Sequence, residues 1–481
     1  MTTTAEPPRP DTSWAVPAPR PTTPATPRHR VHVVPRWWRD TTGALTWLSM
    51  LVVVALWVRG GGLSDLSGYA TGLTSLGRVT ALVASDLLLV QVLLMARIPW
   101  VEQSYGQDEL ARRHRLVGFW SFNLMVAHIV LITLGYAATA RTGVLAETWD
   151  LLVTYPGMLL ALAGALLMVM VTVTSIRRAR RRLRYESWHL LHLYAYLGVG
   201  LALPHQLWSG QEFLTSTTAT LYWWSLWIAA AGSVLVWRVV VPVYRTLVHD
   251  LRVVAVTRES RDTVSVTMRG RHLHRLPVSA GQFFTWRFLD GSGWTRGHPY
   301  SLSAAPGHDT LRITVKDLGD GSGTLRRVRV GTRVAIEGPY GRLHAGVRTR
   351  PGVLLMASGI GVTPLRGLLE ALPQEPGDVT LLYRARDTGS LVLKREIEAL
   401  AAERGARVVY VLGPRIPGRR SWLPRSAAAL TDVAALTELV PDVAQRDVYL
   451  CGSGEWMEAA HDAARDSGVP EQAIHEERFT W

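Results

Sequence analysis

Hydrophobic residues are distributed in two different ways along the chain, and the change falls near residue 248. Before it, long apolar segments alternate with short polar connections. The apolar segments are approximately 43–60, 74–97, 115–138, 151–174, 187–207 and 218–241. Each approaches the roughly 20 residues that an α-helix needs to cross a bilayer. The pattern therefore predicts a membrane α-helical bundle of six transmembrane helices over residues 41–247, held in the lipid bilayer.

After residue 248 the apolar runs are shorter and of two kinds. Segments such as TVSVTMRG, QFFTWRFL and LRITVK concentrate β-formers between Gly- and Pro-rich turns, which predicts an antiparallel β-barrel over residues 248–348. From residue 349 to 481 strand-like runs alternate with helical ones, which predicts an α/β doubly wound nucleotide-binding domain. Residues 1–40 lack apolar periodicity and are rich in Pro, Thr and Arg, so we expect a disordered tail there.

The arginines of the connections predict the orientation of the bundle. They are concentrated before the first span, in the second and fourth connections, and after the last span, whereas the other connections contain few. Because basic residues accumulate on the cytoplasmic side of a membrane, we expect a multi-pass protein of the cell membrane with both termini in the cytoplasm.

Composition excludes two kinds of site. The net charge is +14, but all 52 basic residues except Lys316 and Lys394 are arginine and they are spread along the chain. Since the charge singles out no binding face, we expect no nucleic-acid partner. Cys451 is the single cysteine, so the chain by itself forms neither a disulfide nor a thiolate iron–sulfur cluster.

Two of the predicted spans each carry a pair of histidines. His128 follows His114 by about four helical turns, and His205 follows His192 by slightly less. At 1.5 Å per residue each pair is separated by about 20 Å along a helix. Because these two spans run in the same direction, His114 and His192 share an inner layer, and His128 and His205 share an outer one. Four imidazoles in two layers suit two stacked b-type haems, each held by one histidine from either helix.

Three features of this histidine pattern leave alternatives open. His114 lies in the basic stretch ARRHR and is also compatible with an interfacial position. His189 lies one helical turn before His192 and competes with it as the inner ligand. The interval from His192 to His205 is one position shorter than that of the other pair. It turns His205 about 140° away from the face of His192, and a bend at Pro204 would be needed to re-aim its ring.

The soluble half contains four motifs that point to cofactor binding. HPYS spans His298 to Ser301, and KDLGDGSGTL follows from Lys316 with glycines that allow a phosphate to approach the backbone. ASGIGVTPL contains Gly359 and Gly361 between an apolar strand and a helix, the context of a dinucleotide-binding turn, although a proline replaces the third glycine of the usual fingerprint. The chain ends in HEERFTW, whose aromatic side chains could cover a flat ring.

In this order the motifs resemble those of the ferredoxin–NADP reductase family of flavoproteins. HPYS is similar to the variant of the flavin motif found in NADPH oxidases and ferric reductases, and the histidine-bearing bundle looks like the ferric-reductase-type transmembrane domain of the same enzymes. The resemblance covers about residues 40–481. It implies an NAD(P)H oxidase or ferric reductase-type oxidoreductase with FAD, two b-type haems and NADPH as cofactors.

The resemblance also implies roles for individual residues. The implied flavin-binding and pyrophosphate-binding residues are Pro299, Tyr300, Ser301, Gly323 and Thr324. The implied nicotinamide nucleotide-binding residues are Gly359, Gly361, Thr363 and Pro364. Cys451 would lie near the reacting carbon of the nicotinamide, and Trp481 would stack on the flavin and move aside for hydride transfer.

One position departs from the family pattern and leaves the phosphate contacts open. His298 stands where soluble reductases have an arginine, so Arg296 or Lys316 is expected to neutralise the pyrophosphate. Arg415 matches the place of the family's 2′-phosphate arginine, and Arg384 at the end of an earlier strand could assist it. We expect NADPH rather than NADH, because no acidic residue stands directly at that strand end.

These features together predict a transmembrane flavohaem oxidoreductase. Electrons would pass from cytoplasmic NADPH through FAD and the two bis-histidine haems to a small acceptor outside the membrane. Dioxygen, which would give superoxide, is the expected acceptor. A ferric or cupric chelate is the close alternative, and an electron-relay subunit that donates to a protein partner is a second.

Overall fold

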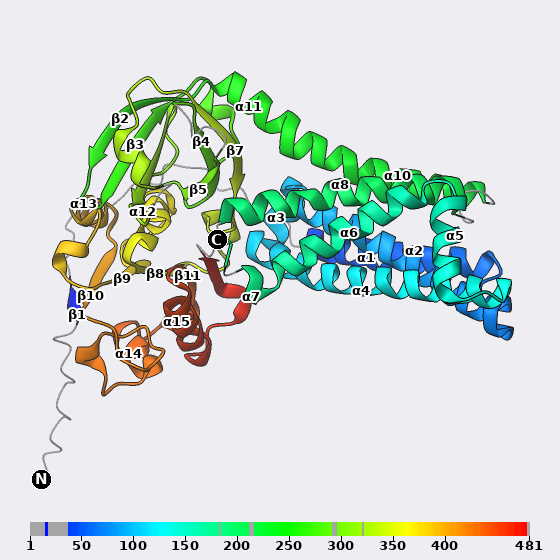
Figure 1. Ribbon diagram of the computed structural model, residues 1–481. Helices are drawn as coiled ribbons and strands as arrows, with labels where there is room; N and C mark the ends of the chain where they lie inside the picture. Colours follow the sequence, from blue (N-terminus) through cyan, green and yellow to red (C-terminus); the bar gives the residue numbers. More distant parts are fainter. Residues whose placement is uncertain are drawn as a thin grey trace, which may run out of the picture. The chain divides into compact units, whose positions relative to one another are not determined.

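The chain folds into two compact units (Figure 1). This computed structural model describes residues 15–17, 37–180, 182–183, 185–210, 216–290, 296–319 and 322–478. The helical unit comprises Arg36–Val101 and Glu109–Val239, and the other unit comprises mainly Val240–Thr480 together with Glu102–Asp108. The C-terminal Trp481 lies outside the described residues, as does most of the predicted tail. Within that tail, Ala15–Pro17 forms the short strand β1.

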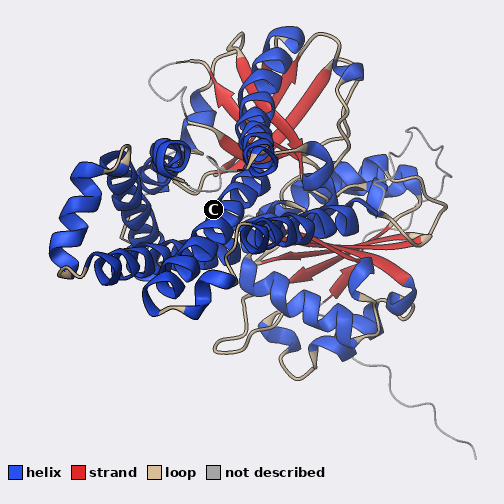
Figure 2. Ribbon diagram, turned by 90° about the vertical axis from the view of Figure 1, so that its right-hand side faces the viewer, coloured by secondary structure: helices blue, strands red, loops and turns tan. Residues whose placement is uncertain are grey.

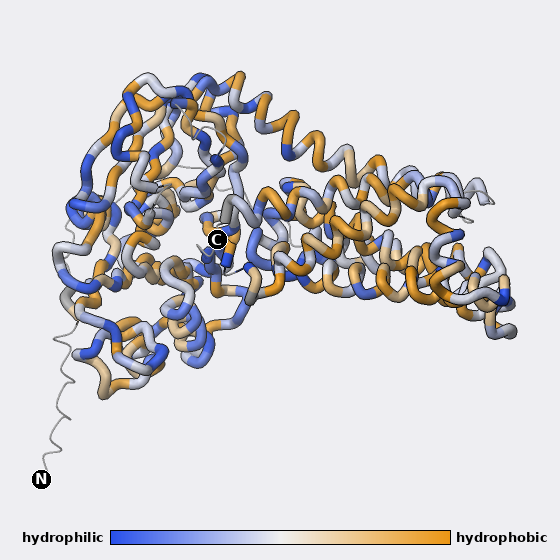
Figure 3. Tube along the Cα trace, viewed as in Figure 1, coloured by the Kyte–Doolittle hydropathy of each residue, from blue (hydrophilic) through white to orange (hydrophobic). Residues whose placement is uncertain are grey.

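Long helices build the first unit. They are α1 (Trp37–Arg59), α2 (Tyr69–Met95), α4 (Gln107–Ala140), α5 (Val144–Thr154), α6 (Met158–Ser175), α8 (Tyr185–Ser209) and α10 (Thr217–Leu235). Short helices α3 (Pro99–Tyr105) and α7 (Arg177–Arg180) lie in the connections, and a π-helical turn, Val236–Val240, joins α10 to α11 (Val241–His249). Figure 3 shows that hydrophobic residues predominate along the long helices.

Five of the described helical segments are long and apolar enough to cross a membrane. They are Trp37–Arg59, Tyr69–Met95, Gln107–Ala140, Met158–Ser175 and Thr217–His249. The sixth predicted span, 187–207, corresponds to α8, which is a continuous helix through Pro204 but is not among the five. His192, His205 and Gln206 lower its mean hydropathy. The sequence pattern also missed α5, an eleven-residue helix at the third connection.

Small residues allow the helices of this unit to approach closely. A Cβ atom added to Gly164 of α6 would lie 2.7 Å from the carbonyl oxygen of Gly198 in α8, and one added to Gly77 of α2 would lie 3.1 Å from the backbone nitrogen of Ile132 in α4. Packing through small residues is typical of helices in lipid, where no hydrophobic effect drives them together. The two pairs, α6 with α8 and α2 with α4, are therefore fixed by backbone contact.

Two three-stranded antiparallel sheets form the next part of the chain. One has the order β2 (Arg252–Arg258), β3 (Thr263–Arg269), β6 (Thr310–Lys316); the other has the order β5 (His298–Ser301), β4 (Phe283–Phe288), β7 (Val334–Tyr340). Isolated bridges between Arg252 and Arg333 and between Leu302 and Ile313 join them. One buried cluster that includes Phe284, Trp286 and Ile313 fills the space between the sheets.

A six-stranded sheet forms the last part. Its order is β1, β10 (Arg407–Leu412), β9 (Val379–Ala385), β8 (Gly352–Ser358), β11 (Arg446–Gly452), β12 (Ile474–Arg478). All pairs are parallel except the edge pair of β1 with β10. The helices are α12 (Val362–Ala371), α13 (Lys394–Arg404), α14 (Asp432–Leu439) and α15 (Gly454–Asp466). Figure 2 shows helices on both faces of this sheet, where two separate hydrophobic clusters lie.

The strand order of this sheet reverses at β8. The chain passes from β8 outward to β9 and β10, and then returns to place β11 on the other side of β8. In open α/β sheets, ligands bind outside the carboxyl ends of the strands at such a switch point. The turn after β8 and the end of β11 are therefore the expected places for a nucleotide site in this domain.

Candidate functional site

The HPYS motif forms the edge strand β5. Ser301 pairs with Phe283 and Tyr300 with Phe284 of β4. Trp286 Nε1 donates a 2.9 Å hydrogen bond to the carbonyl oxygen of Tyr300, which fixes the strand on the core. The hydroxyl oxygen of Ser301 is buried and has no hydrogen-bond partner among the described residues. Such an orphaned group is suited to a polar atom of a bound ligand.

The turn after β8 lies at the switch point of the sheet. Gly359 has φ +56° and open space around its Cα, so its backbone is accessible to a ligand. A Cβ atom on Gly361 would lie 2.2 Å from the carbonyl oxygen of Cys451 at the end of β11. Only glycine fits this approach. The structure thus brings two predicted sites, the glycine turn and Cys451, into contact.

The first turn of α12 holds the other two predicted nucleotide-binding residues. Thr363 and Pro364 are both buried, and the hydroxyl of Thr363 donates a 2.9 Å hydrogen bond to the carbonyl oxygen of Ile360. The threonine side chain therefore stabilises the turn, and the backbone is the part of this segment that a ligand can contact.

Cys451 lies opposite a glutamate that no sequence motif singled out. Cys451 and Glu477 are register partners on β11 and β12, and both are buried. Burial raises the pKa of the thiol, and the charges of Glu477 and Asp108 raise it further. Burial and the charges of Asp108 and Glu102 likewise raise the pKa of Glu477 well above its ordinary value. The surroundings of Glu477 therefore favour its protonated form over the carboxylate.

The carboxyl group of Glu477 lies near the strand that pairs with β5. One of its oxygens, Oε2, is buried and has no hydrogen-bond partner in the described part of the chain. A Cβ atom on Gly341 would lie 2.7 Å from this oxygen and 3.0 Å from the ring of Phe283, the register partner of Ser301. The only sequence signal for Glu477 is its position in HEERFTW, a motif whose predicted role rests on its aromatic residues.

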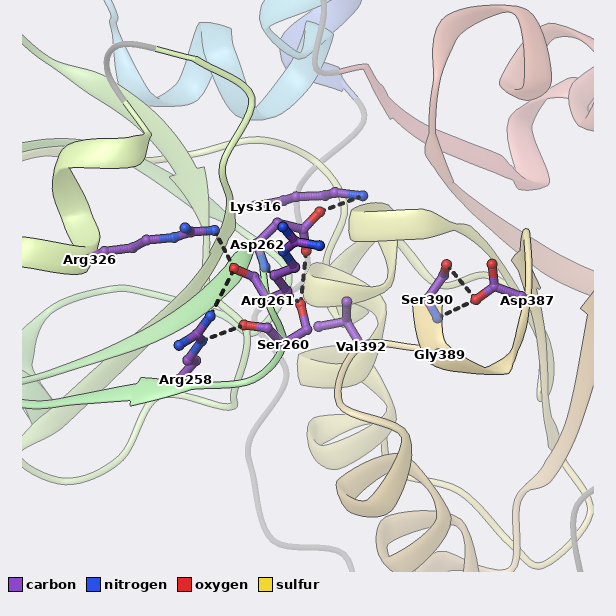
Figure 4. Close-up of a pocket in the computed structure, with 10 residues that line it drawn as sticks. All are labelled: Arg258, Ser260, Arg261, Asp262, Lys316, Arg326, Asp387, Gly389, Ser390 and Val392. Carbon is purple, nitrogen blue, oxygen red and sulfur yellow. Dashed lines mark hydrogen bonds and ion pairs between the residues drawn. The ribbon is translucent and has the colours of Figure 1, made fainter.

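Lys316, Gly323 and Thr324 lie at the end of β6 and in the turn that follows it. Lys316 forms a 3.3 Å ion pair with Asp262, and Gly323–Arg327 forms a five-residue 3₁₀ turn. Beside them is a cavity of about 910 Å³, shown in Figure 4. The cavity is lined by Arg258, Ser260, Arg261, Asp262, Lys316, Arg326, Asp387, Gly389, Ser390 and Val392. Four of these side chains are basic and two are acidic, so the cavity has a positive balance that suits an anionic group.

Arg384 and Arg415 lie at the carboxyl side of β9 and β10, near each other. The guanidinium group of Arg384 is buried and donates to the carbonyl oxygens of Ala385, Val411 and Pro414. Burial and the charge of Arg415 lower the pKa of Arg384 to about 10. Arg415 is exposed and donates a 2.8 Å hydrogen bond to the hydroxyl of Ser453. Arg384 is therefore committed to backbone carbonyls, and Arg415 is the residue of the two that can reach a ligand.

The four histidines predicted as ligands lie in two pairs in the helical unit. His114 and His128 are on α4, and His192 and His205 are on α8. The rings of His114 and His192 have centroids 5.8 Å apart, whereas His205 lies close enough to His128 for their charges to interact. His114 lies within α4 despite its basic surroundings, and the ring of His192 faces it.

Hydrogen bonds at Nδ1 orient three of these rings. Nδ1 of His128 lies 2.9 Å from the carbonyl oxygen of Gly77, and Nδ1 of His114 lies 3.4 Å from that of Gln91. Nδ1 of His192 lies 3.3 Å from the hydroxyl oxygen of Ser175. A histidine whose Nδ1–H is donated to a carbonyl presents the lone pair of Nε2, which is the usual arrangement of a metal-binding imidazole.

The inner pair also has the spacing that a haem iron needs. A metal–imidazole bond is about 2 Å long, so two imidazoles on opposite sides of one iron would have centroids about 6 Å apart. The observed separation of His114 and His192 is 5.8 Å. Nδ1 of His205 is buried without a hydrogen-bond partner in the described residues, so this nitrogen is open to a ligand. The residues present therefore fit two bis-histidine sites.

Family models match three consecutive parts of the chain. Residues 80–203 match the ferric reductase-like transmembrane component, residues 250–345 the oxidoreductase FAD-binding domain, and residues 355–462 the oxidoreductase NAD-binding domain. The first match contains His114, His128 and His192 and ends just before His205. The second contains HPYS and KDLGDGSGTL, and the third contains the glycine turn and Cys451.

Curated relatives match a little under half of the chain. The ferredoxin reductase component of 3-ketosteroid-9-alpha-monooxygenase from Mycolicibacterium smegmatis is 32% identical over 47% of this chain and 63% of its own length. A flavohemoprotein from Bacillus subtilis is 26% identical over 46% of this chain and 57% of its own length. The chain thus spans about three fifths of each of these relatives.

Among solved structures, a cytochrome P450 reductase from Amycolatopsis is similar at 26% identity. The similarity covers 48% of this chain and 70% of that one, with a TM-score of 0.40. The three family matches agree with the order of the domains and motifs described above. The chain is therefore an oxidoreductase in which a ferric reductase-like transmembrane component is fused to FAD-binding and NAD-binding domains, as in a ferric reductase or NADPH oxidase-like fusion.

Proposed function

We propose that this protein is a transmembrane flavohaem oxidoreductase that moves electrons from cytoplasmic NADPH to dioxygen outside the membrane. The observation that carries the proposal is the pairing of histidines from α4 and α8, with His114 and His192 at 5.8 Å and three of the four rings held at Nδ1. When bound, FAD and two b-type haems would supply carriers that accept the two electrons of a hydride and pass them on singly.

The histidines would hold one haem in each layer. His114 and His192 would bind the inner haem, and His128 and His205 the outer one. Held by these histidines, each haem would supply a carrier for single electrons. The carbonyl oxygens of Gly77 and Gln91 would keep the α4 rings in the tautomer that binds metal. This arrangement requires α8 to be a sixth membrane span beside the five apolar helices, with both termini in the cytoplasm.

In the soluble half, Pro299, Tyr300 and Ser301 would contact the flavin, with the orphaned Ser301 hydroxyl as a donor to the ring. Lys316 would neutralise a phosphate at the basic cavity, next to Gly323 and Thr324. The backbone of Gly359 and Gly361 would approach the nicotinamide nucleotide at the switch point, and Arg415 would contact its 2′-phosphate. The buried carboxyl of Glu477, beside Cys451, would hold a proton on Oε2 near the reacting rings.

Reduced-minus-oxidised spectra of the purified protein test the haem sites. We expect two b-type haems per chain in the wild type and in His189→Ala. The double variant His192→Ala with His205→Ala should lose both. Two retained haems in the double variant would contradict the proposed ligands.

The names of the curated relatives favour a second acceptor. The 3-ketosteroid monooxygenase relative is a reductase component and the glycine betaine monooxygenase relative is a reductase subunit, which makes a protein acceptor the second candidate. NADPH-dependent reduction of cytochrome c by the isolated chain, suppressed by superoxide dismutase, would support dioxygen. Activity only with ferric or cupric chelates would identify a metal reductase, and activity only with an added protein would identify a relay subunit.

A further inference from the structure

A fully buried aspartate lies deep within the helical unit. Asp86 is on α2 and has no exposed surface. It lies nearly five helical turns after the first residue of α2, Tyr69, and two and a half turns before the last, Met95. At 1.5 Å per residue these separations are about 25 Å and about 14 Å. Asp86 therefore lies far from both ends of a helix that is long and apolar enough to cross a membrane.

Two hydroxyl groups from two other helices contact the carboxyl group of Asp86. Ser49 Oγ of α1 donates to Asp86 Oδ1 at 2.5 Å, and Tyr222 Oη of α10 donates to the same oxygen at 2.9 Å. The two hydroxyl oxygens are 2.7 Å apart. The second carboxyl oxygen, Oδ2, is buried and has no hydrogen-bond partner within the described residues. All the polar contacts are thus on one side of the group.

No positive charge compensates Asp86 within the described residues, since the ion pairs found there do not include it. The groups that face it are the hydroxyl of Ser49 from α1 and the phenol of Tyr222 from α10, and neither is basic. An ionised carboxylate without a cation is costly in hydrocarbon, and such a group becomes neutral instead. A proton needs an oxygen that no donor already occupies, and Oδ2 is that oxygen.

We propose that Asp86 is an intramembrane proton-binding site, with the proton on Oδ2 at neutral pH and with Ser49 and Tyr222 holding Oδ1. The bound ligand is a proton, and the equilibrium is between the carboxylic acid and a carboxylate plus a free proton. The site joins α1, α2 and α10, so loss of the proton would place an uncompensated charge at the contact of three helices.

The position of Asp86 on α2 gives the proton a role that rests on the proposed function. The same helix supplies the carbonyl oxygens of Gly77 and Gln91, which contact His128 and His114. Asp86 lies between these two residues in sequence. A negative charge there would make electron carriers in either histidine layer harder to reduce. The bound proton removes that charge and keeps the region between the two layers neutral.

Infrared spectroscopy of the whole protein in lipid nanodiscs tests the proposal. A protonated carboxyl group absorbs above the amide band, and a carboxylate does not. We expect wild type minus Asp86→Asn to show a carboxylic acid C=O band at neutral pH. Tyr222→Phe removes one donor to Oδ1 without removing the carboxyl group, so the band should persist at a shifted frequency. Ser49→Ala removes the other donor to Oδ1 and should shift the band in the same direction. If Asp86→Asn fails to fold, wild type minus Ser49→Ala is the difference spectrum that tests the proposal.

Two results would overturn the proposal. One is a wild-type spectrum with no band that Asp86→Asn removes, and the other is a band that neither Tyr222→Phe nor Ser49→Ala shifts. Visible spectra of the same samples separate this proposal from the proposed function. An Asp86 band in a protein without haem would refute the haem sites alone, whereas haem in a protein without the band would refute the proton site alone.

Discussion

Two fully buried aspartates, Asp86 in the helical unit and Asp447 in the nucleotide-binding domain, have opposite surroundings. Both oxygens of Asp447 accept hydrogen bonds, from the backbone N–H groups of Thr349 and Arg350, the hydroxyl of Thr349 and the ring of His475. Burial alone would raise the pKa of Asp447, but His475 and these N–H groups outweigh it and lower the pKa. Asp86 has two hydroxyl partners, both on one oxygen.

The difference follows from which donors each environment can supply. The loop before β8 has backbone N–H groups that no ladder uses, and they can stabilise an anion. The N–H groups of transmembrane helices are engaged within the helix, so side-chain hydroxyls are the donors that remain. A buried carboxyl group is therefore expected to be an ionised structural anchor at position 447 and a neutral proton site at position 86.

The largest effect is expected from Asp447→Ala. It removes the acceptor for four donors, of which the ring of His475 is buried, so it should lower the free energy of unfolding by about 3–5 kcal/mol. Asp442→Ala is the matched control, because Asp442 is half-exposed and pairs with Arg446; it should cost no more than about 1 kcal/mol. Urea unfolding followed by tryptophan fluorescence measures both. Equal losses of unfolding free energy in the two variants would show that the donors around Asp447 find other partners.

In the helical unit, a large loss of stability is expected at a close contact between two glycines. Gly164→Ala places a methyl group 2.7 Å from the carbonyl oxygen of Gly198, whereas Gly200→Ala meets nothing within 4 Å in the described residues. We expect Gly164→Ala to destabilise the packing of α6 on α8 by roughly 1–3 kcal/mol. Gly200→Ala should be neutral or slightly stabilising, since alanine favours a helix. The thermal midpoint of the detergent-solubilised protein distinguishes the two, and equal midpoints would contradict the close crossing.

A smaller effect is expected where charges connect the FAD-binding and nucleotide-binding domains. Arg312 of β6 donates to both carboxylate oxygens of Glu396 in α13 at 2.9 and 2.8 Å, and Arg366 of α12 lies 3.1 Å from the same carboxylate. Arg312→Ala should lower the free energy of unfolding by about 1–2 kcal/mol. The loss is smaller than for a fully buried ion pair, because Glu396 is partly exposed.

The pH dependence of this ion pair has a definite sign. Burial alone would raise the pKa of Glu396, but Arg312 and Arg366 outweigh it and lower the pKa. The stabilisation is therefore complete above the ordinary glutamate pKa of 4.5 and is lost as the pH falls below it. The destabilisation by Arg312→Ala should shrink on acidification of the solubilised protein. A cost that stays constant down to strongly acidic pH would contradict the ion pair.

Glu477 should respond to pH in the opposite direction to Glu396. Its pKa is raised by burial and by Asp108 and Glu102, so the protonated form stabilises the fold. That contribution is complete below pH 4.5 and is lost as the pH rises toward the raised value. Glu477→Gln, which cannot ionise, should match the wild type in thermal midpoint at acidic pH and exceed it at alkaline pH. A constant difference between the two proteins at all pH values would contradict the buried, protonated carboxyl.

Several features of the site could be predicted from local patterns. The spacing of His114, His128, His192 and His205 predicted two pairs, and the family resemblance is confirmed by the matches over the membrane, FAD-binding and NAD-binding parts. The glycine turn after an apolar strand predicted a switch-point site, and the structure brings it against Cys451. These signals are local, because a single helix or a single strand–turn–helix unit sets each of them.

Other features depended on contacts between distant segments. Arg384 was expected to help bind a phosphate, but its guanidinium group is engaged by three carbonyl oxygens at the ends of β9 and β10. Glu477 gave no signal of its own, because its burial comes from β11 and its raised pKa owes part to Asp108, near the start of α4 and far away in the sequence. The stacking predicted for Trp481 stays a prediction, since this residue lies outside the described part of the chain.

The sequence by itself determined the apolar helices, the strand-rich and alternating α/β segments, and the residue types available for cofactors, because periodicity and turn chemistry act over short distances. Only the tertiary structure decided which of His189 and His192 faces His114, which arginine remains available to a ligand, and which buried carboxyl groups have donors. The physical reason is that burial and hydrogen bonding depend on what other segments supply, and the charge state of a buried group follows from its partners rather than from its residue type.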